Sequence, residues 1–334
     1  MKIRHLNNIC ISLLATTALT GCITDDFAEC PNEYELKIIF DRNMLFADAF
    51  ASQVKSVDIK VFDSETGHKV YSFSDDSPAL ESADYRVPLP VPPGSYDILC
   101  WAGMAEGNSF GYADPTGDFL EDQHVLLNTD NGISDNRLNN LYHGLSKDVT
   151  FIDNNTVGNT QVQTATIYLT KDTNRIYVML LNLDGNEMHE SEFTFSISSA
   201  NAEIDYDNSI AAGRKVMYQP WSVSPILSEI DNSSGPVQSA LGAELSVGRL
   251  TTDTQSRLDV HRVADGERII SIPLERNLLL YKGEYYSFMS DQEFLDRQDD
   301  YVVTFILDKN NNWDRAAMIY INNWATPPIQ YQEW

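Results

Sequence analysis

Short runs of alternating apolar and polar residues recur along most of this chain, and they constrain its fold more than any other feature. In residues 33–40 (EYELKIIF) an apolar side chain falls at every second position, the periodicity of a β-strand with one buried face. Similar runs follow at spacings of about 8 to 15 residues, with turn signals such as Asp265-Gly266 between them. This spacing predicts an all-β protein built from β-sandwiches.

Turn-forming residues predict how neighbouring strands connect. Residues 95–101 (SYDILCW) predict a strong strand, whereas Pro88 and Pro90 place the preceding run at a sheet edge, because proline cannot donate a ladder hydrogen bond. Residues 103–140 are polar and weakly patterned, which favours a surface excursion with one short helical turn. Four pairs of runs predict β-hairpins: 57–61 with 68–73, 162–169 with 175–183, 258–263 with 268–274, and 301–307 with 316–324.

The length of the chain, 334 residues, fits about two domains of roughly 100–200 residues each. Its hydrophobic content of 43% supplies enough apolar material for real cores and excludes wholesale disorder. A polar stretch at residues 153–159 (DNNTVGN) separates two groups of strand-like runs and fits a linker. We therefore expect an N-terminal β-sandwich domain over residues 33–155 and a C-terminal one over residues 160–334.

The N-terminus has the features of an export signal over residues 1–21. Lys2 and Arg4 precede a short apolar stretch, which is too short for a membrane-spanning helix. The signal ends in Leu19-Thr20-Gly21-Cys22, which resembles the bacterial lipobox. That resemblance implies lipidation of Cys22 and a lipidated tether over residues 22–32. The simpler alternative is an ordinary secretory signal with a chance cysteine.

The net charge of −26 limits the partners of the chain. Such an excess of acid repels phosphate backbones and anionic membrane surfaces, so nucleic acid is excluded and lipid on Cys22 must supply membrane attachment. The acidic pair Asp25-Asp26 behind that cysteine resembles a surface-export signal of Bacteroidetes lipoproteins, although a solvated acidic tether fits equally well.

Two cysteines remain in the body of the chain, Cys30 and Cys100. In an oxidising compartment they can form one disulfide that joins the tether to a core strand. Alternatively they stay as two free thiols, with Cys100 as a small buried side chain. The sequence favours neither alternative. No Cys or His spacing indicates zinc. The remaining histidines are scattered and fit surface or loop positions: His68, His124, His143, His189 and His261.

Three motifs with chemical meaning are weak. Residues 107–111 match G-x-S-x-G, but the following residues cannot form the helix that a nucleophile elbow needs, so a loop tip is favoured. His189-Glu190 lacks the second histidine of H-E-x-x-H. Asp308–Asp314 resembles a calcium loop without its glycine and its final glutamate, and a hairpin loop is favoured. We expect no catalytic residue, no metal ion and no cofactor.

Five segments in order resemble one family, the Bacteroidales fimbrial anchor lipoproteins of the FimB type. They are the lipobox-like motif, Cys30-Pro31 before a strand, residues 89–103 (LPVPPGSYDILCWAG), residues 166–180 (TIYLTKDTNRIYVML) and the closing run 301–324. The resemblance implies two tandem transthyretin-like Greek-key β-sandwich domains, an outer-membrane location, and binding to fimbrial shaft subunits. The alternative is a surface lipoprotein that binds or processes glycans with a β-sandwich face.

The C-terminal residues 325–334 (ATPPIQYQEW) are the candidate segment for partner contact. Pro327-Pro328 prevents a continued strand, and Ile329, Tyr331 and Trp334 then offer apolar groups on a short extended segment. Related systems join subunits by inserting one subunit's strand into the next. An anchor that keeps its lipid cannot lose its first strand, so residues 33–40 are expected to stay in place and the C-terminus to act as the donor. A frayed or self-packed terminus is the alternative.

Overall fold

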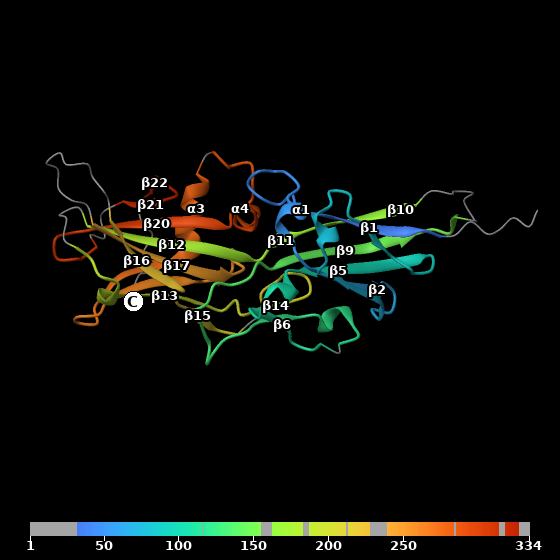
Figure 1. The fold of residues 1–334 in the computed structure, drawn as a ribbon, viewed down its shortest axis with the longest axis horizontal. Helices are drawn as coiled ribbons and strands as arrows, with labels where there is room; N and C mark the ends of the chain where they lie inside the picture. The colour runs from blue at the N-terminus through green and yellow to red at the C-terminus, as the bar shows by residue number, and fades with distance from the viewer. Residues whose placement is uncertain are drawn as a thin grey trace, which may run out of the picture.

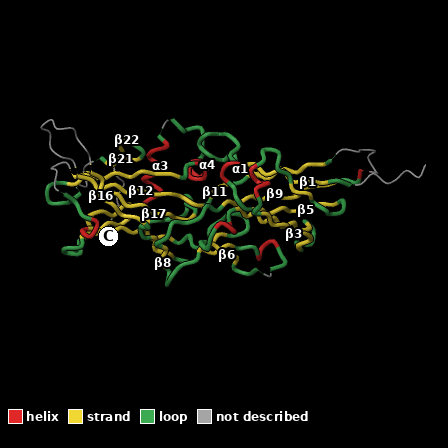
Figure 2. Tube along the Cα trace, viewed as in Figure 1, coloured by secondary structure: helices red, strands yellow, loops and turns green. Residues whose placement is uncertain are grey.

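The computed structural model describes residues 32–115, 117–154, 162–182, 187–211, 213–227, 239–283, 285–313 and 318–326. Figure 1 shows an elongated molecule, with β1 (Tyr34–Ile39) towards one end and β22 (Trp324–Thr326) towards the other. Strands dominate and helices are short (Figure 2). The predicted all-β sandwich class is confirmed. The described helical segments are α1 (Phe50–Gln53), η1 (Pro78–Glu81), η2 (Met104–Glu106), η3 (Leu120–Asp122), η4 (Glu190–Glu192), α3 (Leu274–Lys282) and α4 (Asp291–Arg297).

The N-terminal half is formed by two facing sheets. In the smaller sheet, β1 lies between β10 (Gln163–Tyr168), to which it is parallel, and β4 (Val87–Pro88), the edge strand that the prolines predicted. Alternate residues of β1 are buried, as the sequence periodicity predicted. The larger sheet has the strand order β11 (Thr170–Lys171), β9 (Tyr142–Phe151), β5 (Gly94–Ala102), β2 (Val57–Asp63) and β3 (Lys69–Asp75).

The C-terminal half is also formed by two sheets. One has the order β16 (Ser222–Leu227), β17 (Ser239–Gly248), β12 (Thr173–Asn182), β20 (Asp300–Leu307), β21 (Ile319–Ile321) and β22. The other has the order β19 (Arg268–Pro273), β18 (Arg257–Arg262), β13 (Phe193–Ser199), β15 (Val216–Tyr218) and β8 (Ile133–Ser134). Alternate apolar side chains of β12 are fully buried between them, which sets the strand's inward face: Ile176, Val178 and Leu180.

The excursion after β5 is packed and is not the polar surface loop that the sequence predicted. It contains β6 (Phe110–Tyr112), β7 (Val125–Leu127) and β8, and β7 pairs with β14 (Glu203–Ile204) of the C-terminal half. Its apolar side chains are sparse, but Leu120 and Val125 are buried in the same cluster as Trp101. The excursion therefore covers the outer face of β5 and connects the two halves.

Three of the four predicted hairpins are confirmed: β2 with β3, β18 with β19, and β20 with β21. The prediction for residues 162–169 and 175–183 was wrong. β10 pairs with β1, β11 pairs with β9, and β12 runs on into the other half, so residues 170–174 form a crossover and no turn (Figure 1). Residues 155–161, which include most of the expected linker, lie outside the described residues. Strand pairing places β10 and β11 with the N-terminal sheets and favours a boundary after Lys171, beyond the expected start at residue 160.

Candidate functional site

Most of the site residues predicted from sequence lie outside the described residues: Cys22, Cys30, Ile329, Tyr331 and Trp334. Lipidation, disulfide formation and C-terminal partner contact therefore stay predictions. Cys100 lies in β5 and is fully buried, and burial raises the pKa of its thiol. None of the described helices is long and apolar enough to cross a membrane.

Two of the weak motifs have structural roles in loops. Ser109 Oγ accepts a hydrogen bond from the Asn139 backbone N–H at 3.1 Å, which fastens the start of the excursion to its end. Asp308 Oδ1 accepts backbone N–H groups of Asn310 and Asn312 at 2.8 and 2.9 Å. These hydrogen bonds lower the pKa of the Asp308 carboxyl. They are the local contacts of an Asx-type turn, as the sequence composition favoured.

A buried charged network lies where the chain crosses between its halves. Asp172, between β11 and β12, is fully buried, and its backbone N–H donates to Leu141 O at 2.8 Å. Its Oδ1 lies 3.6 Å from Arg249 Nε and accepts from Asn208 Nδ2 at 3.2 Å. Burial raises the pKa of Asp172 to about 7, although Arg249 acts in the opposite direction. The crossover is thus held by groups from the C-terminal half.

Arg249 extends this network to helix α4. Its Nη2 donates to Asp296 Oδ1 at 2.9 Å, and its Nη1 donates to the backbone oxygen of Asn208. Only about 11% of the Arg249 side chain is exposed, so these charge-assisted contacts are largely shielded from solvent. One guanidinium therefore links the end of β17, the crossover and α4.

A second connection joins α4 to the N-terminal half. Arg297 Nη1 donates to the backbone oxygens of Asp41 and Asn43 at 2.9 and 3.3 Å. Its guanidinium also lies 4.6 Å from the centre of the Phe46 ring, a cation–π arrangement. Nearby, Lys171 forms an ion pair with Asp299. These contacts fix α4 against the loop that follows β1.

His143 contributes an uncharged polar contact at the same junction. Its Nε2 lies 2.8 Å from Tyr206 O, and its ring packs edge-on against Trp101 with 4.7 Å between ring centres. Because a carbonyl oxygen only accepts, Nε2 carries the proton. Burial lowers the pKa of His143 to about 4, so the ring is neutral near pH 7.

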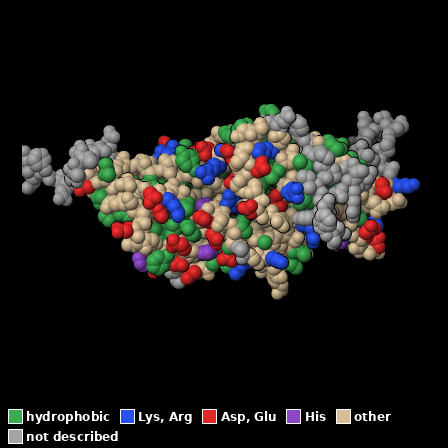
Figure 3. Space-filling view, turned by 180° about the vertical axis from the view of Figure 1, so that it is seen from behind, with side chains coloured by type: hydrophobic (Ala, Val, Ile, Leu, Met, Phe, Trp, Pro, Cys, Tyr) green, Lys and Arg blue, Asp and Glu red, His purple; other side chains and the backbone are tan. Residues whose placement is uncertain are grey.

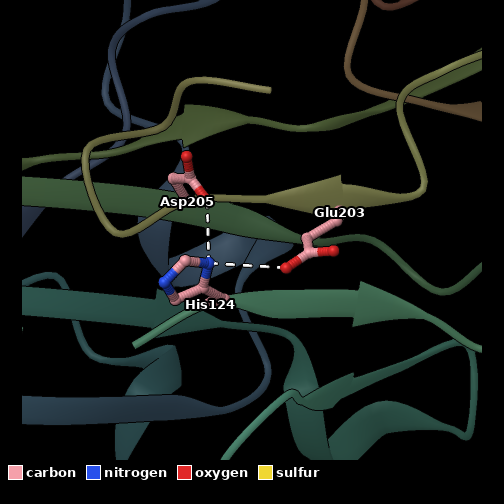
Figure 4. A group of neighbouring side chains, drawn as sticks. All are labelled: His124, Glu203 and Asp205. Carbon is pink, nitrogen blue, oxygen red and sulfur yellow. Dashed lines mark ion pairs between the residues drawn. The ribbon is translucent and has the colours of Figure 1, made fainter. Parts of the chain in front are cut away.

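Three side chains of the types that bind metal ions lie together at the small sheet that joins the excursion to the C-terminal half. His124 precedes β7, Glu203 lies in β14, and Asp205 follows β14. His124 Nδ1 lies 2.8 Å from Asp205 Oδ1 and 3.5 Å from Glu203 Oε1. Figure 4 shows Nδ1 as the ring vertex that faces both carboxylates. The sequence predicts a surface or loop position for His124, although Glu203 and Asp205, two positions apart, have the spacing of one strand face.

An exposed apolar patch is shared by two loops. Leu45 and Phe46 follow β1, and Tyr285 and Phe288 connect α3 to α4; their exposed fractions are 81%, 50%, 77% and 70%. The Phe46 and Phe288 ring centres are 6.2 Å apart, and the two loops adjoin in Figure 1. Contiguous exposed apolar groups commonly mark interaction surfaces.

Charge on the visible rear face is dispersed. Figure 3 shows Asp and Glu side chains spread along the molecule and interleaved with Lys and Arg. The acidic excess of the sequence is therefore not gathered into one docking field on that face.

A match to a protein-family model shows which family the chain belongs to. Residues 27–327 match the family model described as fimbrillin-A associated anchor proteins Mfa1 and Mfa2. The chain belongs to this family. This membership confirms the resemblance drawn from sequence motifs and assigns the protein a structural or adhesive role in fimbriae.

Solved structures with the family's fold agree over nearly the whole chain. A candidate adhesin of Bacteroides thetaiotaomicron is 31% identical, with a TM-score of 0.79 over 90% of this chain and 99% of its own. A candidate polysaccharide-binding protein of the same species is 26% identical, with a TM-score of 0.74 over 90% and 99%. The fimbrial anchor protein Mfa2 of Porphyromonas gingivalis is 17% identical, with a TM-score of 0.67 over 90% and 100%, a likeness of fold. No curated protein gave a significant match.

Proposed function

We propose that the protein is an outer-membrane lipoprotein that holds a fimbrial shaft to the cell surface, a binding role without catalysis. One observation carries the proposal: the match to the fimbrial anchor family begins at residue 27, directly behind the lipobox-like Leu19-Thr20-Gly21-Cys22. A single acyl chain binds membranes only marginally, so several chains on Cys22 are needed for stable attachment. A protein of the same fold in Porphyromonas gingivalis is named a fimbrial anchor, which supports the proposal.

The lipid attachment is tested on the mature N-terminus. Mass spectrometry is expected to show an acylated Cys22 as the first residue. Cys22→Ala is expected to move the protein out of the membrane fraction, whereas the matched control Cys30→Ser leaves it there. A Cys22→Ala protein that stays wholly membrane-bound contradicts the proposed anchor.

The shaft contact is proposed to use the C-terminal segment as a donor strand. β1 pairs on both sides, with β10 and with β4, so losing it would break both ladders and separate the lipid from the body. That arrangement supports retention of β1. Residues 325 and 326 already pair with β21 as part of β22, so the proposed donor is the stretch 327–334 behind them. Main-chain hydrogen bonds to a strand edge would supply affinity, and Ile329 and Tyr331 would supply specificity.

Deletion of residues 329–334 tests the donor against surface docking. The truncated lipoprotein is expected to fold, reach the membrane and release fimbriae into the medium. The comparison variant Phe46→Ser with Phe288→Ser removes the two phenylalanine rings of the exposed patch, and cells that carry it are expected to retain their fimbriae. Normal retention by the truncated protein would contradict the donor strand, and loss of fimbriae in the patch variant alone would indicate surface docking.

A second candidate function is surface glycan binding. The 26% identical relative is a candidate polysaccharide-binding protein, and the C-terminal half has an open cavity of about 890 Å³ whose lining includes the polar side chains of Ser209, Lys215 and Gln292. Binding of soluble oligosaccharides, measured by calorimetry and weakened by Lys215→Ala, would support this function. An absence of binding at millimolar concentrations would exclude it for the glycans tried.

A further inference from the structure

We propose that His124, Glu203 and Asp205 form a binding site for a divalent transition-metal ion, with Zn²⁺ the cation that fits best, and that the ion links the excursion to the C-terminal half. The three residues lie on or beside paired strands: Glu203 is opposite Leu126 and Ile204 is opposite Val125 in the β14–β7 ladder. A cation bound there would connect segments from both halves of the molecule.

The hydrogen-bond geometry of His124 indicates a positive charge between the three side chains. His124 Nε2 lies 2.5 Å from Glu121 O, and since a carbonyl only accepts, Nε2 carries a proton. In a neutral ring, Nδ1 then presents a lone pair to Asp205 Oδ1, 2.8 Å away. Two lone pairs at that distance repel, so the contact requires either a second proton or a cation that binds both atoms.

The contacts favour a cation over a second proton. Within the described residues, His124 Nδ1 and Asp205 Oδ1 are buried atoms that have no hydrogen-bond partner, although they lie at ion-pair distance. A proton on Nδ1 would normally be directed at one carboxylate oxygen. In Figure 4 the Nδ1 vertex faces both carboxylates, with Asp205 on one side and Glu203 on the other. A metal ion on that vertex would take one oxygen from each.

Each proposed ligand has the kind of outer partner that metal ligands use. His124 Nε2 donates to the Glu121 carbonyl, which fixes the tautomer with Nδ1 available. Arg214 Nε lies 3.1 Å from Glu203 Oε2, the oxygen that is not turned towards His124. Ser209 Oγ donates to Asp205 Oδ2 at 3.4 Å. The three inward atoms are therefore held in place by contacts on their far sides.

The ligand types select the class of ion. One imidazole nitrogen with two carboxylate oxygens disfavours Mg²⁺ and Ca²⁺, which prefer oxygen ligands alone. Zn²⁺ accepts nitrogen and oxygen ligands in tetrahedral sites, where water completes the shell when the protein supplies three. The side chains are 22–33% exposed, so solvent can reach them and supply such a water. The site was not predicted because His124 is far along the chain from Glu203 and Asp205.

The test measures Zn²⁺ on the mature chain without an affinity tag and with Cys22 and Cys30 replaced by Ser, so that neither thiol competes. Calorimetry at pH 7.5 is expected to show one Zn²⁺ per chain, a higher melting temperature with Zn²⁺, and no such effects with Ca²⁺. His124→Gln and Asp205→Asn are each expected to weaken Zn²⁺ binding by about tenfold or more. The matched control His189→Gln, at an exposed histidine, is expected to bind normally.

Three results would overturn the metal site. One is the lack of stoichiometric Zn²⁺ binding by the parent chain, which does not depend on how any variant folds. The other is equal Zn²⁺ affinity in the parent chain and in a folded His124→Gln protein. A His124 ring that NMR shows to be doubly protonated at pH 7.5 in the presence of Zn²⁺ would assign the cluster to a simple ion pair and also reject the proposal.

Discussion

Asp172 and Arg249 form a buried ion pair at the point where the chain passes from one half of the molecule to the other, with 3.6 Å between Oδ1 and Nε. Asp172 is fully buried, and its Oδ2 has no hydrogen-bond partner within the described residues. Burying ionised groups is costly, so such a pair is weak evidence for net stability. Its position at the crossover suggests that it fixes how the two halves are joined.

Asp172→Ala is expected to lower the free energy of unfolding by about 3 kcal/mol, because it removes one partner of a buried pair and leaves the other charge undercompensated. Urea denaturation at pH 7.5 measures the change. The control is Glu81→Ala, which breaks an exposed ion pair with Lys55 and should cost less than about 1 kcal/mol. Equal effects of the two substitutions would show that the buried pair at the crossover contributes no more to stability than an exposed ion pair does.

Strand positions could be predicted from the sequence because burial of one sheet face imposes a period of two. β1 shows this alternation clearly, and turn residues located the hairpin of β18 and β19. The crossover at residues 170–174 could not be recognised, since its polar residues are also typical of a turn. Its burial is set by Arg249 and Asn208, which are distant in sequence.

Helices α3 and α4 were missed, although the sequence held local signals for them. Leu274 and Leu278 are buried at helical spacing, and Ser290 Oγ caps α4 by accepting the Glu293 N–H at 3.0 Å. The short length of both helices makes those signals weak beside the strand pattern. The His124 cluster had only one weak local signal, the two-residue spacing of Glu203 and Asp205, because strand pairing is what brings His124 to them.

The pH dependence of stability is expected to include a contribution from His143. Its pKa is about 4 in the folded protein and near 6.5 when unfolded, so the unfolded state binds the proton first as the pH falls. The contribution is complete above pH 6.5 and is lost as the pH falls towards 4, by about 3 kcal/mol. Asp172 and Glu275 have the opposite effect on the pH dependence of stability. Because burial raises both of their pKa values to about 7, their contribution to the free energy of unfolding is lost as the pH rises towards 7.

His143→Gln isolates that contribution because glutamine can still donate to Tyr206 O but does not titrate. The carboxyl groups are common to both proteins and cancel in the comparison. The advantage of the parent protein over the variant should be larger at pH 7.5 than at pH 4.5, by about 2–3 kcal/mol in urea denaturation. The same difference at both pH values would mean that His143 titrates normally in the folded state.

Gly103 is expected to tolerate no side chain. It follows β5 with φ +85°, and an added Cβ would lie 1.9 Å from the Asn140 backbone oxygen. Gly103→Ala should therefore prevent folding or cost more than about 3 kcal/mol, from backbone strain and a collision that no side-chain movement relieves. Gly132→Ala is the matched control, since Gly132 has φ +80° but open space around it, and it should cost about 1–2 kcal/mol. Thermal unfolding of both variants measures the two losses of stability. Similar losses would show that the backbone at Asn140 moves aside to accommodate the added methyl group.

Arg297 is expected to control how tightly the loop after β1 is held against α4. Its guanidinium donates to the backbone oxygens of Asp41 and Asn43 and lies over Phe46, and only about 15% of its side chain is exposed. Hydrogen bonds from charged groups contribute roughly 1.5–3 kcal/mol each, so Arg297→Ala should make local opening of residues 41–49 easier by at least about 1.4 kcal/mol. Amide hydrogen exchange across that segment should then quicken about tenfold or more.

Lys282→Ala provides the control, because Lys282 pairs with Asp291 and joins α3 to α4 within the C-terminal half alone. It should leave exchange in residues 41–49 unchanged while it lowers protection in α4. Unchanged exchange of residues 41–49 in Arg297→Ala would mean that the crossover, with Asp172 and Arg249, holds the two halves without help from α4. Faster exchange confined to that loop would instead show that the halves are joined at two places, the crossover and the contact of α4 with the loop after β1.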